Sequence, residues 1–303
     1  MHRQRKSSFH GRIATRAVTA VAVVALGLAT AAPTAPTGAA TSAASRLAIC
    51  RTEMPSLEYV RGHLTVATDN PVSSPWYVQN HPANGQGYEA GVVYAVASQL
   101  GVVRRDVTWV VEPYATSYVA GKKPFDFDAN EVTYAPARAR AVSFSTSYYD
   151  VHQAIVALKD NPIVTNHSVR QLRTYRYGDL AGTPGLAYIT RFIHPRTPAQ
   201  SFSTMTALVS ALESGVIDAL VIDTPTGNYM TTSQLVDSSG NPFATVVGQF
   251  PSTGDHYALV FQKGNPLVGC VDLALATLRA NGTLASLTQR WLGSYTHLPT
   301  IKP

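Results

Sequence analysis

An arginine and an aspartate, placed in different halves of the chain, could together hold a small charged molecule. Arg138 lies in a polar stretch, and its planar guanidinium offers two parallel donors that suit a carboxylate. Asp223 follows the apolar segment 219–222 and can accept hydrogen bonds from an ammonium group. Open α/β sheets place ligands in the crevice beyond their strand ends. The pair therefore predicts a site for a molecule that carries both charges.

Each of these residues also has a simpler interpretation. Arg138 taken alone is a typical surface charge, and Asp223 before Thr224-Pro225 could cap a helix, since Asp before Pro is a common helix start. Thr133 and Thr183 can add hydroxyl hydrogen bonds to a ligand, although small hydroxyl residues in turns often bond only the backbone. We expect binding roles for the charged pair and no structural role for either member.

The segments that would position these side chains alternate between strand and helix patterns. Apolar residues recur at helical spacing in 89–100, which Gly87 precedes and Gly101 follows. The other elements expected from the sequence are strands at 63–68, 107–111, 125–129, 153–158, 219–222 and 257–261, and helices at 204–214, 266–280 and 284–292. This alternation predicts mainly parallel sheets with helices on their faces.

Two motifs carry a family resemblance. Residues 125–138 read FDFDANEVTYAPAR and continue into a Phe-Ser and a Tyr pair, and residues 212–223 read LESGVIDALVID. Together they resemble the family 3 extracellular solute-binding proteins, the polar amino-acid receptors of ABC importers. The resemblance covers nearly all of 63–292. It implies an α/β, two-lobe periplasmic-binding-protein fold of type II, with two mixed sheets flanked by helices and joined by a two-strand hinge.

The resemblance also implies a domain division and partners. Lobe 1 is expected at 51–150 plus 256–303, lobe 2 at 151–255, and a signal peptide with a flexible lead-in at 1–45. It implies a monomer that binds an amino acid without cofactor or metal. It also implies that the membrane permease of an ABC importer is its partner. The expected ligand-binding residues are Arg138, Asp223, Thr133, Thr183, Glu131, Asn130, Trp76 and Tyr114.

The sequence departs from the family pattern at three places. Ser73 or Val72 stands where many relatives have an aromatic residue that stacks on the ligand, and Trp76, Tyr77 or Tyr114 could substitute. Pro184 replaces a residue whose backbone N–H donates, which proline cannot do. Glu131 would favour a ligand with a cationic side chain if it faces the cleft, and would otherwise be a solvated surface residue.

The N-terminus has the layout of a secretory signal peptide. Five basic residues precede the uncharged stretch 17–32, which is shorter than a bilayer span. Without these five basic residues the formal net charge falls from +6 to about +1. The remaining basic residues are scattered, so we do not expect nucleic-acid binding. We expect a secreted protein that is held at the cell surface through its transporter.

The two cysteines, Cys50 and Cys270, predict a disulfide, because an exported chain enters an oxidising compartment. The alternative is a lipidated Cys50, although Ile49 stands where a small residue is expected.

Two other functions remain open. The first is a secreted dehydratase on the same fold, for which Glu131 is the only obvious acid, and the second is a sensory or partner-binding protein that has lost its ligand. Sequence patterns of zinc proteases, serine hydrolases and phosphate loops are absent.

Overall fold

A computed structural model describes residues 42–293 and 298–302 of the chain. The predicted signal peptide lies outside these residues, apart from its final positions. Helix α1 (Ala43–Leu57) already begins at the end of the segment expected to be a flexible lead-in, and it buries Leu47, Cys50 and Met54. The expectation of a lead-in through residue 45 is therefore wrong at its last three positions, because the helix buries an apolar side against the rest of the chain.

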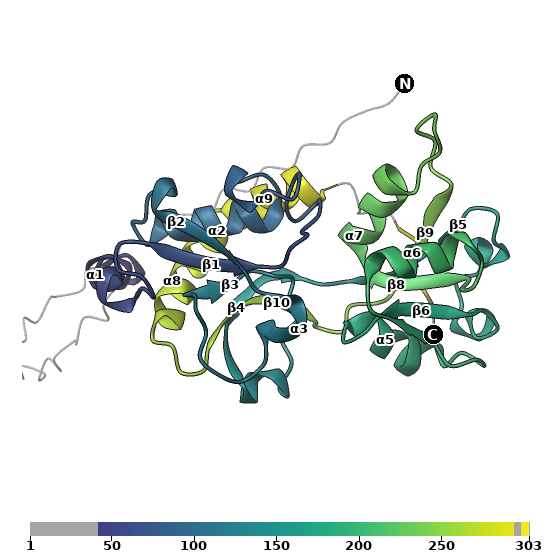
Figure 1. Ribbon diagram of the computed structural model, residues 1–303, viewed down its shortest axis with the longest axis horizontal. Helices are drawn as coiled ribbons and strands as arrows, with labels where there is room; N and C mark the ends of the chain where they lie inside the picture. Colours follow the sequence, from purple (N-terminus) through teal and green to yellow (C-terminus); the bar gives the residue numbers. More distant parts are fainter. Residues whose placement is uncertain (1–41, 294–297, 303) are drawn as a thin grey trace, which may run out of the picture. The chain divides into compact units, whose positions relative to one another are not determined.

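The first sheet contains five strands in the order β2-β1-β3-β10-β4 (Figure 1). Strand β1 pairs in parallel with β2 and β3, whereas β10 is antiparallel to β3 and β4. Their bounds are β1 (Leu64–Thr68), β2 (Val107–Val111), β3 (Phe127–Asp128), β4 (Val142–Asp150) and β10 (His256–Gln262). Helices α2 (Tyr88–Gln99), α8 (Leu267–Ala280) and α9 (Thr283–Leu292) pack on it, and with α1 they share one hydrophobic core.

The second sheet also contains five strands, in the order β7-β6-β8-β5-β9. Alternate residues of its central strands point to opposite faces, so Ile155 and Val221 join one core while Val156 and Leu220 join another. Its strands are β5 (Gln153–Leu158), β6 (Tyr177–Leu180), β7 (Gln200–Phe202), β8 (Ala219–Asp223) and β9 (Ala244–Gln249); the helices that pack near it include α5 (Pro184–Tyr188), α6 (Met205–Glu213) and α7 (Thr224–Tyr229).

The remaining elements are short. They are helices α3 (Tyr114–Ser117) and α4 (Val169–Leu172), 3₁₀ turns at Pro82–Asn84, Arg104–Asp106, Arg138–Arg140 and Pro162–Thr165, and π-helical turns at Ile189–Ile193 and Met230–Gln234.

The chain passes between the sheets by strands that follow one another closely. Strand β4 in the first sheet leads into β5 in the second, and β9 in the second leads back to β10 in the first. The C-terminal residues then return to the second sheet. Thr300 pairs with Gln249 of β9, and Ile301 is 1% exposed within the core of that sheet. The expectation that lobe 1 extends to residue 303 is therefore wrong for 299–302, because these residues cover the otherwise unpaired edge of β9.

The predicted disulfide between Cys50 and Cys270 is present, with a Cα–Cα distance of 5.6 Å and a sequence separation of 220 residues. It joins α1 to α8. Because its sulfur forms this bond, Cys50 has no thiol to carry a lipid, and the lipidated alternative does not fit this structure.

Candidate ligand-binding site

Arg138 has an unusual set of partners for an arginine. Its guanidinium donates to Thr133 O at 2.9 Å, to Tyr114 Oη at 3.3 Å and to Gly182 O at 3.1 Å, and it lies 3.9 Å from the centre of the Tyr118 ring. None of the described carboxylates lies within 4 Å of it. The positive charge is therefore oriented by neutral groups and remains available to an anion. This set of bonds also contradicts the expectation that Arg138 has no structural role.

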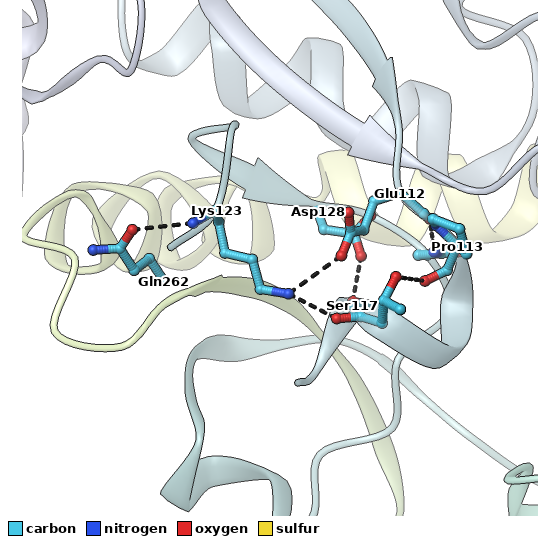
Figure 2. Close-up of polar contacts among 8 residues, drawn as sticks. Glu112, Pro113, Ser117, Lys123, Asp128 and Gln262 are labelled. Atoms are coloured by element: carbon cyan, nitrogen blue, oxygen red, sulfur yellow. Dashed lines mark hydrogen bonds and ion pairs between the residues drawn. The ribbon is translucent and has the colours of Figure 1, made fainter. Parts of the chain in front are cut away.

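A network of polar contacts links α3 to β3 and to the segments on either side of α3 (Figure 2). Lys123 Nζ donates to Thr116 O at 2.7 Å and pairs with Glu112 Oε1 at 3.2 Å, while Ser117 Oγ donates to Asp128 Oδ2. These contacts fix α3, and thereby Tyr114, against the end of β3. Burial raises the pKa of Asp128 to about 8, so this carboxyl is largely protonated at neutral pH. No sequence pattern indicates this network, because its members are scattered polar residues.

The loop that follows β3 brings together three of the predicted site residues. Asn130 is buried and donates to Glu112 O at 3.1 Å, so its amide supports the loop. Thr133 is 6% exposed, and its hydroxyl has no hydrogen-bond partner among the described residues. A buried hydroxyl without a partner is costly, which makes Thr133 a good candidate for bonding a ligand.

Glu131 adopts a left-handed backbone conformation with φ of 52°. Its N–H donates to Glu89 Oε1 at 2.8 Å, and Tyr148 donates its hydroxyl to the same oxygen. Burial, followed by the charges of Glu89, Asp223 and Asp69, raises the pKa of Glu131 well above its ordinary value. The side chain of Glu131 is half-buried within reach of these charges, and its orientation toward the cleft stays a prediction.

Trp76 is completely buried, and its ring contacts Tyr88, Tyr149 and Tyr257 edge-on. Its indole N–H donates to Thr226 Oγ1 at 2.8 Å, which links the first-sheet core to the start of α7. Tyr77 is equally buried and donates to Ala129 O. Of the three aromatic residues proposed as substitutes for the missing ring, Tyr114 alone contacts Arg138 directly.

Asp223 and Thr183 stand at helix starts on the second sheet. Asp223 Oδ1 accepts from Thr226 N at 2.9 Å and caps α7, so the expectation that Asp223 lacks a structural role is wrong. Its other oxygen is not used by this cap. Burial raises the pKa of Asp223 to about 6. Thr183 precedes α5, and its hydroxyl donates to Leu180 O at 2.8 Å.

Glu89 is the main site residue that the sequence interpretation missed. It is 1% exposed, and burial raises its pKa to about 7. A signal was available, because Glu89 shares the buried side of α2 with Val92, Val93 and Val96. A carboxylate on the apolar side of a helix is seldom left without a role.

The comparison with family models decides the classification, because residues 64–294 match the bacterial extracellular solute-binding proteins, family 3. The chain belongs to this family. The binding protein is 27% identical over 176 residues to ABC transporter arginine-binding protein 1 of Escherichia coli, covering 56% of this chain and 67% of that one. It is 25% identical over 245 residues to the L-cystine-binding protein TcyA of Bacillus subtilis, covering 77% and 82%.

Solved structures show the same fold. An ancestral arginine-binding protein bound to glutamine matches with a TM-score of 0.62 at 23% identity, covering 78% of this binding protein and all of the other chain. The arginine-, lysine-, histidine-binding protein ArtJ of Geobacillus stearothermophilus matches with a TM-score of 0.59 at 19% identity, covering 77% and 96%. The two mixed five-stranded sheets therefore form the type II, two-lobe fold that the sequence predicted.

Proposed function

We propose that the binding protein captures an amino acid between its two lobes and delivers it to the permease of an ABC importer. The observation that carries this proposal is the guanidinium of Arg138, which is held in place by neutral groups with none of the described carboxylates beside it. A ligand carboxylate would supply the missing anion through two parallel hydrogen bonds.

Asp223 would bind the ligand's ammonium group from the opposite lobe. Its Oδ1 already caps α7, so the ammonium would bond the remaining oxygen. Thr133 Oγ1 would gain the partner that it lacks in the described chain. A single zwitterionic molecule would thus pair with the positive charge of Arg138, the negative charge of Asp223 and the hydroxyl of Thr133.

The remaining assignments follow from the family and the sequence. Lobe 1 would comprise 51–150 with the segment from 256 through α9, and lobe 2 would comprise 151–255 with 299–302. The protein would be secreted as a monomer after removal of its signal peptide, without cofactor.

Isothermal titration of the purified protein with the twenty common amino acids tests the proposal. At least one should bind with a dissociation constant in the micromolar range or below, and mass spectrometry should recover it unchanged after incubation. Failure of every amino acid to bind would contradict the proposal, and conversion of the ligand would favour a dehydratase-like enzyme instead.

A further inference from the structure

We propose that Trp76 of the first lobe is a positioning residue for Asp223 of the second lobe, and that it acts through the hydroxyl of Thr226. The contacts that join these three residues exist without a ligand. Their importance for binding an ammonium group rests on the proposed function, which assigns that group to Asp223.

Trp76 is held rigidly on the first-sheet side. It is completely buried, and its ring meets the rings of Tyr88, Tyr149 and Tyr257 edge-on, with centroid distances of 5.7, 5.5 and 5.4 Å. These three tyrosines belong to α2, β4 and β10, so separate elements enclose the indole. Because the ring is held on several sides, the direction of its N–H is fixed. That N–H donates to Thr226 Oγ1 at 2.8 Å.

Thr226 is held equally firmly on the second-sheet side. It is buried in the first turn of α7, and its backbone N–H donates to Asp223 Oδ1 at 2.9 Å. The residue that accepts the hydrogen bond from Trp76 is therefore the same residue that holds the Asp223 carboxylate. One threonine connects a first-lobe aromatic ring with the proposed ammonium site.

The chemistry of the Thr226 hydroxyl gives this connection a direction. An indole N–H can only donate, whereas a hydroxyl accepts and donates at once. Trp76 uses the oxygen of Thr226 as an acceptor, so the hydroxyl hydrogen is left for a different acceptor. Burial raises the pKa of Asp223 to about 6, and hydrogen bonds from the Thr226 N–H and hydroxyl oppose this rise. Trp76 thus keeps the hydroxyl oriented as a donor to the carboxylate.

Tyr257 offers a competing route from Trp76 to Asp223. Its ring packs against Trp76, and its hydroxyl also lowers the pKa of Asp223. A change at Trp76 could therefore reach Asp223 by shifting Tyr257. The two routes differ in whether the Thr226 hydroxyl is required.

Other ionisable groups act on the same carboxylate and stay unchanged in every variant below. They are the acids Glu89 on α2, Glu131 after β3 and Asp179 on β6.

The experiment measures the pKa of Asp223 in the ligand-free protein. Aspartate carboxyl groups labelled with ¹³C are titrated by NMR, and Asp223→Asn identifies the signal of interest. Trp76→Phe removes the indole N–H and keeps an aromatic ring. Trp109→Phe is the matched control, because it removes an indole N–H that donates to Tyr94 Oη at 3.1 Å within the first lobe.

Two changes at Thr226 complete the set. Thr226→Val removes the hydroxyl and keeps the side-chain shape and the backbone N–H, whereas Thr226→Ser keeps the hydroxyl. The double variant of Trp76→Phe and Thr226→Val shows whether the two positions act in series.

We expect Trp76→Phe to raise the pKa of Asp223 by about 0.5 and Thr226→Val by about 1, since the loss of one hydrogen bond has an effect of this size. Thr226→Ser and the Trp109→Phe control should match the wild-type protein within the error of the titration. In the Thr226→Val protein, Trp76→Phe should have no further effect.

Two results would overturn the inference. An unchanged pKa of Asp223 in Trp76→Phe would show that the indole does not position the carboxylate. A full effect of Trp76→Phe in the Thr226→Val protein would show that Trp76 acts by packing, as through Tyr257. If Trp76→Phe does not fold, 3-benzothienylalanine at position 76 keeps the ring shape without the N–H and makes the same test. Failure of all amino acids to bind would instead remove the proposed function and leave these pKa differences in place.

Discussion

The two sides of the site use their polar residues differently. On the first-sheet side, Thr133 Oγ1 and Glu89 Oε2 are buried without partners among the described residues, and none of the described carboxylates pairs with Arg138. On the second sheet, Asp223 and Thr183 already make local hydrogen bonds at the starts of α7 and α5. These first-side residues therefore have unused bonding capacity, whereas Asp223 and Thr183 would combine their proposed binding roles with the support of their own helices. Mutations should affect mainly affinity on the first side, and on the second side they should also lower ligand-free stability where they remove one of these local hydrogen bonds.

The largest effect is expected at Arg138. Arg138→Ala would leave the ligand carboxylate without its two donors, and removal of one partner from such a pair costs roughly 3 to 5 kcal/mol, or more than a hundredfold in affinity. Arg140→Ala removes an exposed arginine from the same turn and is the control. Calorimetric titration with the amino acid that binds the wild-type protein measures both. Binding by Arg138→Ala within threefold of wild type would refute the proposed anion site.

Asp223 should show the double role of the second side. Asp223→Asn keeps an oxygen that can accept from Thr226 N but loses the charge, so we expect affinity to fall about tenfold or more with little change in ligand-free stability. Asp223→Ala loses the cap as well and should also lower the free energy of unfolding by about 1 kcal/mol. Urea unfolding of the ligand-free variants separates the two. Equal stability of both variants would show that the cap contributes nothing.

Affinity and stability should respond to pH in opposite directions. Burial raises the pKa of Asp223 to about 6, so below that pH the carboxyl is protonated and an ammonium must displace the proton. Affinity should therefore fall by up to about tenfold per pH unit below pH 6, and Asp223→Asn should remove this dependence. A pH-independent affinity in the wild-type protein would exclude Asp223 from ammonium binding.

Ligand-free stability should instead decrease as pH rises. Glu89 keeps its proton to higher pH in the folded protein, where its pKa is about 7, than in the unfolded chain. The folded state then binds more protons than the unfolded state between about pH 4.5 and 7, and its stability declines over that range. Glu89→Gln should make the decline shallower, as measured by urea unfolding at several pH values. An unchanged slope would contradict this.

The smallest effect compares two threonines. Thr133→Val removes a buried hydroxyl that has no partner, so we expect binding to weaken about fivefold with no loss of ligand-free stability. Thr183→Val removes the hydrogen bond to Leu180 O and should lower stability by about 1 kcal/mol with affinity changed less than twofold. The reverse pattern, measured by the same titrations and melts, would break the contrast between the two sides.

The sequence predicted those features that local patterns determine. Helix α2 and strands β2 and β5 were expected within about one residue, because apolar periodicity and glycine positions mark them. The motif around Arg138 indicated the family, and the two cysteines indicated the disulfide.

The features that escaped prediction depend on contacts between distant segments. Glu89 Oε2 has no hydrogen-bond partner among the described residues, and Lys123 pairs with Glu112; both features arise from tertiary packing. Helix α1 contains Pro55 and exposes Ile49, so no clear periodic pattern distinguishes it from a flexible lead-in, and it is joined to α8 by the disulfide. The packing of Ile301 in the core of the second sheet was not predicted. Ile301 is an isolated apolar residue in a short tail, and no periodic pattern identifies it.

The two ends of the described chain are attached to different lobes. Cys50 in α1 is joined covalently to α8 of the first lobe, whereas Gln249 of the second lobe donates to Pro299 O and accepts from Ile301 N, each at 2.8 Å. A fluorescent donor protein fused before α1 would therefore be attached to the first lobe, and an acceptor fused after Lys302 would be attached to the second. Energy transfer between them would report any change in the distance between the lobes when the ligand binds, so the two attachment points suit an optical sensor of that ligand.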